Sequence, residues 1–349
     1  MGISLNPQHL KRYKDIAVLL MKYGRFDLVK NAGLEAVLKD EIEFDHAPAS
    51  EARALAEDFE ALGPTFIKLG QLLSTRPDIL PASYLESLSR LQDKVEPFSF
   101  AEVEEIVTSE LGVRISKAFQ EFEATPMAAA SLGQVHRAVL KGGRAVAVKV
   151  QRPGIRGMIV EDLEALMEIA SLLDAHTEMG RRYEFQKVLD EFRKALLREL
   201  DYKLEADNLC VLGENLKEFD RIVVPRAVDG YSTSRVLTMD YIRGKKVTSL
   251  SPLDRIELDG AALAEQLFRA YLKQILVDGF FHADPHPGNI FLTDDKRLAL
   301  LDLGMVARTT PGQQEKLIHL LLAISEGRAE DAASVALQIG DKREEFDEK

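Results

Sequence analysis

Apolar residues recur at three- and four-residue spacings from Leu10 to about Arg90, a pattern that predicts an all-helical segment interrupted at three prolines. Within this segment, Lys68 and Gln71 lie three residues apart, so both side chains are expected on one helix face. The spacing alone is also typical of a solvated surface lysine. We therefore expect a helical extension in which Lys68 and Gln71 are either functional residues or solvated surface residues.

The pattern changes after about Phe100, where one more helix is followed by small residues and then by strand-like alternation. The small residues run from Ala128 to Ser131. The segment 145–150 alternates small and β-branched residues, which predicts a buried strand, yet it contains Lys149. A lysine in this position either extends its ammonium to water or requires a partner for its charge.

Two long amphipathic helices are predicted next, over 159–173 and 185–200. The second pattern continues past Glu199 and Asp201 to Glu205, so we expect one helix to carry all three acids. On such a helix Asp201 and Glu205 share a face, and Glu199 lies about 120° around the axis from Glu205. Three acids on two faces can serve two partners, although a solvated acidic face has the same pattern.

Two short strand-like segments at 221–225 and 235–239 lead to a hinge near Gly244 and a long apolar helix pattern from Ile256 to Phe281. The chain then enters the segment 282–289, where two prolines and a glycine forbid regular structure. Segments 290–292 and 298–301 predict a β-hairpin that is followed by Asp302-Leu303-Gly304.

Composition narrows the class of protein. A chain of 349 residues is long enough for roughly two domains, and its net charge of -12 disfavours nucleic acid as a partner. Residues 1–30 nevertheless carry six basic and two acidic residues, so this end is a candidate for contact with an anionic membrane surface. No segment approaches the ~20 apolar residues of a transmembrane helix. The single Cys210 excludes an internal disulfide and fits a reducing, cytoplasmic compartment.

Five residues together predict phosphoryl-transfer chemistry, which needs a cation on nucleotide phosphates, oxygen ligands for Mg²⁺ and a carboxylate near the attacking oxygen. Lys149 is the candidate cation, and Asn289 and Asp302 are the candidate Mg²⁺ ligands. Asp284 lies five residues before Asn289 in a rigid loop, the separation found in kinase catalytic loops. A buried Lys149 also requires a fixed acid, for which Glu205 is the candidate.

The motifs found along the chain are Lys68-Leu69-Gly70-Gln71, Ala128-Ala129-Ala130-Ser131, Ala147-Val148-Lys149, Glu199-Leu200-Asp201, His282-Ala283-Asp284-Pro285-His286-Pro287-Gly288-Asn289 and Asp302-Leu303-Gly304. In combination they resemble the UbiB/AarF family of atypical kinases over roughly residues 60–310. The resemblance implies an α+β, protein-kinase-like bilobal fold with a helical N-terminal extension across the active site. It also implies ATP binding and hydrolysis, with Mg²⁺, linked to ubiquinone or other prenyl-lipid metabolism at a membrane.

The resemblance also assigns roles to the motifs. The alanine-rich loop Ala128, Ala129, Ala130 and Ser131 replaces the glycine-rich nucleotide loop of ordinary kinases, and alanines restrict the backbone freedom that glycines give such a loop. Lys68, Gln71, Glu199 and Asp201 become candidate regulatory residues, since Lys68 can pair with Glu199 or Asp201 and restrict access to the site. Quinone-precursor lipids and quinone-biosynthesis proteins are the implied partners, and many relatives carry C-terminal membrane helices beyond the length of this chain.

From these observations we expect three regions: a helical extension over 1–100, a kinase-like N-lobe over 101–244 with a helical insert at about 155–217, and a C-lobe over 245–349. Three other functions remain open. One is a metal-dependent hydrolase using His282, Asp284 and His286; against it, His282 more readily serves as an orienting core hydrogen bond. The others are a non-catalytic nucleotide-gated lipid-binding scaffold and a small-molecule kinase of the aminoglycoside phosphotransferase type.

Overall fold

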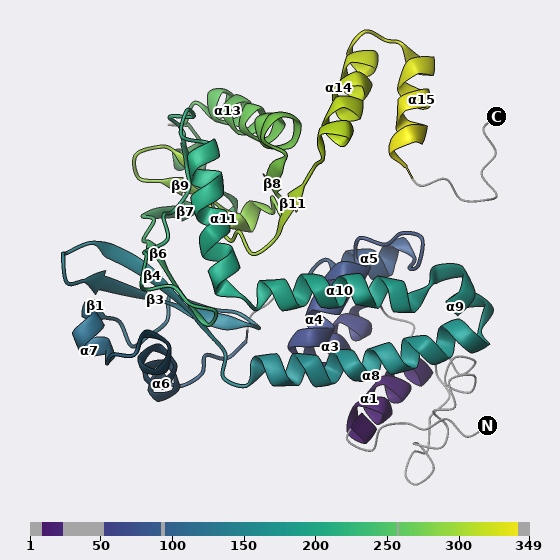
Figure 1. Ribbon diagram of the computed structural model, residues 1–349, viewed down its shortest axis with the longest axis horizontal. Helices are drawn as coiled ribbons and strands as arrows, with labels where there is room; N and C mark the ends of the chain where they lie inside the picture. Colours follow the sequence, from purple (N-terminus) through teal and green to yellow (C-terminus); the bar gives the residue numbers. More distant parts are fainter. Residues whose placement is uncertain (1–8, 24–51, 92–94, 257, 341–349) are drawn as a thin grey trace. The chain divides into compact units, whose positions relative to one another are not determined.

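The computed structural model describes residues 9–23, 52–91, 95–256 and 258–340 (Figure 1). The chain divides into two compact units, of which unit 1 contains Met1–Ala138 and Val148–Asp201 and unit 2 contains Val139–Ala147 and Tyr202–Lys349. The division passes through two neighbouring strands of one sheet. The expected boundaries at 100 and 244 stay predictions.

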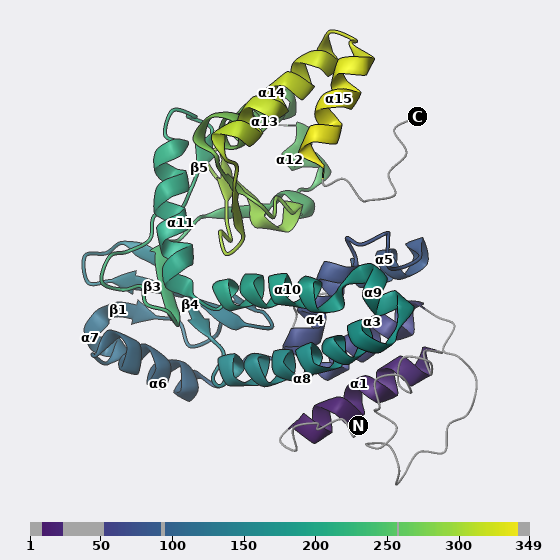
Figure 2. The ribbon, with the colours of Figure 1, turned by 45° about the vertical axis from the view of Figure 1, so that its right-hand side comes forward.

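Unit 1 is mainly helical. Its helices are α1 (Leu10–Lys22), α3 (Ala52–Leu62), α4 (Pro64–Leu73), α5 (Ala82–Leu88), α6 (Phe100–Leu111), α7 (Ile115–Ala118), α8 (Ile155–His176), α9 (Glu178–Tyr183) and α10 (Phe185–Glu199). The helices α8 and α10 lie side by side, α4 packs against both, and α1 packs along α8 (Figure 2). The predicted apolar positions of α8, such as Ile159 and Leu163, are buried in the core of this unit.

The first sheet has the order β1-β3-β4-β6, and β2 pairs with β3 beside it. Its strands are β1 (Phe119–Phe122), β2 (Ala128–Ala129), β3 (Gly133–Leu140), β4 (Ala145–Gln151) and β6 (Val236–Asp240). In β4, Val146, Val148 and Val150 are fully buried, whereas Lys149 is half-buried on the opposite face. The alternation therefore produces the predicted strand and separates the lysine from its apolar neighbours.

Unit 2 combines a second sheet with helices. The sheet has the order β5-β10-β9-β7, and a separate two-stranded pairing joins β8 and β11. The remaining elements of unit 2 are α11 (Tyr202–Asn215), β5 (Ile222–Val223), β7 (Gly244–Lys246), a 3₁₀ turn (Val247–Ser249), α12 (Pro252–Ile256), α13 (Gly260–Lys273), a π-helical turn (Gln274–Asp278), β8 (Phe280–His282), a 3₁₀ turn (Pro287–Asn289), β9 (Ile290–Thr293), β10 (Leu298–Leu300), β11 (Val306–Arg308), α14 (Pro311–Ser325) and α15 (Ala329–Ile339). The predicted hairpin is confirmed, since Leu298 pairs with Leu292 and Leu300 with Ile290.

Two helix predictions are wrong. The helix expected to carry Glu199, Asp201 and Glu205 is two helices, because α10 ends at Glu199 and the Asp201 N–H bonds Arg198 O in a tight turn before α11 begins. The long helix expected from Ile256 to Phe281 is also divided. Capping of α13 by the Asp259 side chain, and later the π-helical turn, interrupt it where apolar periodicity alone carries no boundary.

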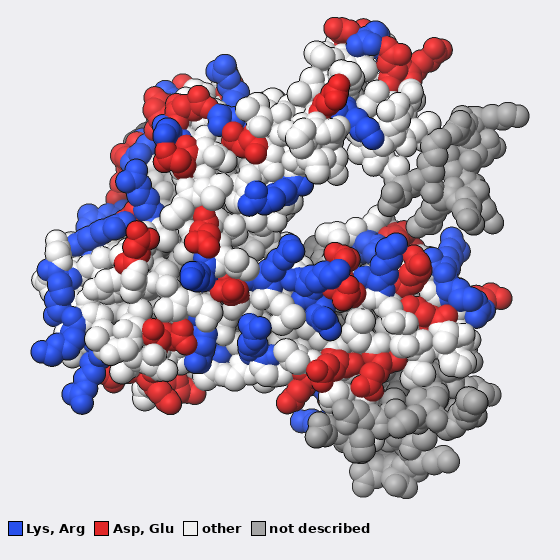
Figure 3. Space-filling view, in the orientation of Figure 1, with Lys and Arg blue, Asp and Glu red and all other residues white. Residues whose placement is uncertain are grey.

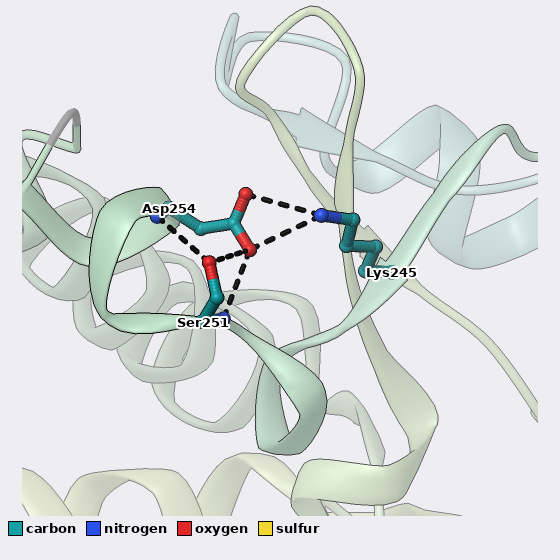
Figure 4. Close-up of polar contacts among 3 residues, drawn as sticks. All are labelled: Lys245, Ser251 and Asp254. Carbon is teal, nitrogen blue, oxygen red and sulfur yellow. Dashed lines mark hydrogen bonds and ion pairs between the residues drawn. The ribbon is translucent and has the colours of Figure 1, made fainter.

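A charged cap fixes the start of α12 in unit 2 (Figure 4). Ser251 and Asp254 exchange hydrogen bonds across the first turn, and Lys245 on β7 lies 3.1 Å from both carboxylate oxygens of Asp254. The Ser251 donors, followed by Lys245, lower the pKa of Asp254 to about 2.

None of the described helices is long and apolar enough to cross a membrane.

Candidate functional site

In unit 2, the segment 282–289 holds an aspartate and an asparagine in contact. Asn289 closes the 3₁₀ turn Pro287–Asn289, and its Nδ2 donates to Asp284 Oδ2 at 3.1 Å. Both side chains are half-buried. Because the amide NH₂ is used on Asp284, the carbonyl oxygen of Asn289 is the atom of this side chain that remains for a cation.

His282 fixes the start of this loop. The residue is 1% exposed, its Nδ1 accepts from the Asp284 N–H at 3.2 Å, and its Nε2 donates to Leu301 O at 3.2 Å. This pattern requires a neutral imidazole with the proton on Nε2, and burial lowers the pKa of His282 below its ordinary value. Both nitrogens serve the backbone, which is the orienting role expected for this histidine.

Asp302 is held beside the same loop by contacts on each side of it. Leu301 N–H donates to Asn289 O at 2.9 Å, and Ala283 N–H donates to Met305 O at 3.0 Å. Asp302 itself has a left-handed backbone with φ of 58°, a conformation that side-chain-bearing residues rarely adopt. The fold therefore maintains a locally unfavourable backbone conformation at Asp302, the candidate Mg²⁺ ligand.

The side-chain oxygens of Asn289 and Asp302 fit Mg²⁺. Carboxylate and amide oxygens are its preferred ligands, and Mg²⁺ usually takes one or two carboxylates and completes its shell with water and phosphate oxygens. Within the described part of the chain there is no group of three or more His, Cys, Asp or Glu residues able to hold a metal. The oxygen ligands of Asn289 and Asp302 are of the type that Mg²⁺ prefers, whereas zinc is usually bound by nitrogen and sulfur ligands.

Lys149 and Glu205 belong to different units, and the expected ion pair between them stays a prediction. Glu205 lies in the first turn of α11 and is 3% exposed, so its carboxylate requires compensation by a cation or hydrogen bonds. One turn further along α11, Asn208 Nδ2 donates to Leu303 O at 2.9 Å. A single helix therefore carries the buried acid and fixes the backbone next to Asp302.

In unit 1, Lys68 on α4 pairs with Glu199 at the end of α10. Lys68 Nζ lies 2.7 Å from Glu199 Oε1, and the two side chains are 16% and 20% exposed. The expected pairing with one of the two candidate acids is confirmed for Glu199, whereas Asp201 lies half-buried in the turn after α10. Gln71 points its amide to another partner and donates to Leu91 O at 3.4 Å.

Gly70 is required by close packing of α4. A Cβ added at this position would lie 2.3 Å from Leu91 Cδ1 and 2.6 Å from Phe59 Cδ2. These distances are far below a normal contact, so a side chain would push α4 away from its neighbours. The glycine of the Lys-x-Gly-Gln motif therefore allows the helix that carries Lys68 to approach this core.

The alanine-rich loop forms a short hairpin in unit 1. Ala128 and Ala129 pair with Val135 and Gln134, and the Ala130 N–H donates to Gly133 O at 2.8 Å. No residue from 128 to 133 has a positive φ. The Ala130 donor is thus used within the hairpin, whereas a glycine-rich loop presents its N–H groups to phosphates.

Sequence reasoning missed three polar residues near the segment 282–289. Gln274, which is fully buried, accepts from the His282 N–H through Oε1 at 3.0 Å. Tyr271 lies one turn earlier, and burial followed by the nearby charge of Asp284 raises its pKa to about 12. Asn208 is the third. Gln274 and Tyr271 interrupt an apolar helix pattern, and that interruption is the signal that could have identified them. Asn208 follows Asp207 in a polar stretch and gives no such signal.

Comparison with known proteins identifies the family and two similar proteins. The family model described as the ABC1 atypical kinase-like domain matches residues 90–336. The chloroplastic protein ACTIVITY OF BC1 COMPLEX KINASE 8 of Arabidopsis thaliana is 41% identical over 83% of this chain and 38% of its own length. The probable protein kinase UbiB of Cellvibrio japonicus is 37% identical over 85% of this chain and 54% of its own length. The chain thus spans about half or less of these relatives.

A solved structure also resembles this chain. The complex of Rv3197 with erythromycin from Mycobacterium tuberculosis matches with a TM-score of 0.58 and 27% identity, covering 85% of this chain and 75% of that one. Together with the family model, this similarity confirms the expected α+β, kinase-like fold and the resemblance to UbiB/AarF proteins.

Proposed function

Because the chain belongs to the ABC1 atypical kinase-like family, we propose that it is an Mg-ATP-dependent atypical kinase or ATPase that supports prenyl-quinone lipid biosynthesis. The bond between Asn289 and Asp284 carries the proposal most directly. This hydrogen bond keeps two groups together in one loop: the carboxylate of Asp284, for the attacking group, and the amide oxygen of Asn289, for the cation. Phosphoryl transfer requires both groups.

Each candidate residue then has a chemical role. Asp302 and Asn289 would hold Mg²⁺ through their side-chain oxygens, and a cation there would supply positive charge to the nucleotide phosphates. Lys149 contacts those phosphates, with Glu205 as its fixed acid. Asp284 orients and accepts the proton of the attacking group. The proposal rests on these residue types, on their order along the chain and on the local contacts within unit 2.

The alanine-rich loop and Lys68 suggest how this enzyme differs from an ordinary protein kinase. With the Ala130 N–H used inside its hairpin, the loop offers fewer backbone donors to phosphates than a glycine-rich loop. The ion pair of Lys68 with Glu199 holds α4 at the end of α10. We therefore expect weak phosphorylation of proteins in trans, with Lys68, Gln71, Glu199 and Asp201 acting as regulatory residues.

We also propose that the N-terminal segment contacts an anionic membrane surface through part of its basic residues. Residues 1–8 and 24–30 lie outside the described residues. In α1, Tyr13, Ile16 and Ala17 are buried in unit 1, and the helix packs where Figure 3 shows acidic side chains along α8. Among the described residues of α1, Lys11 and Lys14 are exposed and available to an anionic lipid surface, so we expect electrostatic contact without insertion of this buried apolar face.

The proposal can be tested by measuring ADP formation with purified protein and Mg-ATP. Parallel reactions contain a quinone-precursor analogue, anionic liposomes, both or neither, and Asp284→Asn serves as the inactive reference. We expect turnover in the parent that rises when a prenyl-quinone precursor is present. Nucleotide binding without turnover in every condition would instead favour the non-catalytic scaffold. Stimulation by small polar alcohols or aminoglycosides, with none by the precursor, would favour a small-molecule kinase.

A further inference from the structure

A buried aspartate in unit 1 connects α1 to the helix that carries Lys68. Asp162 lies on α8 and is 2% exposed. Its carboxylate contacts Arg12 Nε at 2.5 Å and Arg12 Nη2 at 3.1 Å, and it accepts from Thr65 Oγ1 at 2.5 Å. Both carboxylate oxygens are therefore used, one of them by two donors from different helices.

Arg12 makes further contacts that hold it in this position. Its Nη1 donates to Leu62 O at 3.3 Å, at the end of α3, and its guanidinium lies 5.6 Å from the ring centre of Phe66 on α4. The side chain is 22% exposed. Arg12 thus contacts α3, α4 and α8 from α1, although the residues that it contacts lie 50 or more residues away in the sequence.

Thr65 and Lys68 lie three residues apart on α4, one turn of the same helix. Thr65 is fully buried and binds Asp162 on α8, whereas Lys68 binds Glu199 at the end of α10. The two contacts fix adjacent points of α4 to the two long helices. A displacement of α4 at Thr65 is therefore transmitted within one turn to the position of Lys68.

We propose that Asp162, neutralised by Arg12, is a positioning residue that holds α4 so that Lys68 stays on Glu199, and that α1 thereby controls the regulatory lysine. The inference rests on the proposed regulatory role of Lys68. It means that the position of Lys68 on α4 also depends on α1, a helix outside the Lys-x-Gly-Gln motif.

The physical reason is the cost of a buried carboxylate. Burial raises the pKa of Asp162, and the contacts with Thr65 and Arg12 oppose that rise. When Arg12 is absent, Thr65 is the one remaining partner among these contacts, and a single hydroxyl compensates a buried charge poorly. Movement of the carboxylate toward water would draw Thr65 with it, or would break their hydrogen bond and free the first turn of α4.

The test measures the coupling between α1 and Lys68 in the full chain. Arg12→Met removes the charge and retains much of the apolar stem, and Asp162→Asn removes the partner charge at nearly constant size. Lys68→Met and the double variant Arg12→Met/Lys68→Met complete a double-mutant cycle. Lys22→Met is the matched control, because Lys22 also tethers α1, through Asp58 on α3 at 2.7 Å, without contacting α4.

Two quantities are measured for each variant: hydrogen exchange of the α4 amides and the rate of ADP formation. We expect Arg12→Met and Asp162→Asn to accelerate α4 exchange and to change turnover about three- to ten-fold in the direction of Lys68→Met. The double variant should match Lys68→Met, and Lys22→Met should match the parent in both quantities.

Three outcomes would overturn the inference. The first is α4 exchange in Arg12→Met that equals the Lys22→Met control. The second is turnover effects that multiply in the double variant, because independent effects mean that Arg12 does not act through Lys68. The third is loss of turnover in Arg12→Met with unchanged α4 exchange. If the parent itself forms no ADP, the proposed function fails, and α4 exchange in the same variants still decides whether Arg12 and Asp162 position this helix.

Discussion

Replacing Lys68 by methionine tests the ion pair that joins α4 to α10. The substitution keeps the length of the side chain and removes its charge. Glu199 then loses a cation at 2.7 Å while remaining 20% exposed, so its carboxylate is left partly desolvated. Removing one partner of a desolvated pair costs more than the pair itself contributes, because the other charge remains.

The size of the effect follows from the degree of burial. Fully exposed pairs contribute about 0–1 kcal/mol, and breaking a fully buried pair costs about 3–5 kcal/mol. With side chains 16% and 20% exposed, the Lys68 pair lies between these limits, so we expect a loss of roughly 2 kcal/mol. For a unit of this size that corresponds to a decrease of about 4–8 °C in the midpoint of thermal unfolding.

Thermal unfolding of unit 1 and limited proteolysis provide the assay. Cleavage should increase within residues 60–90, and ADP formation should change together with it. The matched control is Arg90→Met, because Arg90 pairs with Glu86 while both side chains are more than two-thirds exposed. If Lys68→Met and Arg90→Met shift the midpoint equally and leave the cleavage pattern alone, Lys68 is a solvated surface lysine and the reasoning fails.

Three further substitutions test other parts of the structure. Asp284→Asn should lower turnover by about 10²–10⁴ and leave ATP affinity close to the parent's, as read by steady-state kinetics and calorimetry; a loss of affinity alone would contradict its catalytic role. Gly70→Ala should destabilise unit 1 by about 1–3 kcal/mol in urea unfolding, whereas Gly157→Ala on α8, where a Cβ meets nothing within 4 Å, should be neutral or stabilising. Asp254, with its pKa lowered to about 2 from an ordinary 3.8, should contribute stability above about pH 4 that is lost as the pH falls through 2. Lys245→Met should flatten that part of the profile in part, because the Ser251 donors remain, and an unchanged acid profile would refute the contribution of Lys245.

The sequence predicts the parts of the fold that local patterns encode. The alternation around Lys149, the hairpin after Asn289 and the periodicity of α8 each depend on neighbouring residues, and all three appear in the structure. Helix ends were predicted less well. The break after Glu199 arises from a backbone turn within an otherwise apolar pattern, so periodicity alone could not place it.

In the candidate site, too, local sequence patterns predicted some features and missed others. Motif spacing identified Asp284, Asn289 and Lys68, and the structure supplies their local partners. Contacts between distant segments left no sequence signal of their own. Asn208 binds the backbone beside Asp302 across 95 residues, and Arg12 reaches Asp162 across 150, so both required the fold to be recognised.

Calorimetric titration of ATP shows whether Asp302 and Asn289 hold Mg²⁺ for a bound nucleotide. The parent is titrated with and without Mg²⁺, in parallel with Asp302→Asn, which keeps the side-chain size and removes one charge. We predict that Mg²⁺ strengthens ATP binding to the parent by at least about ten-fold and that Asp302→Asn abolishes this dependence. Equal Mg²⁺ dependence in the parent and in Asp302→Asn, with equal turnover, would mean that Asp302 does not hold the cation.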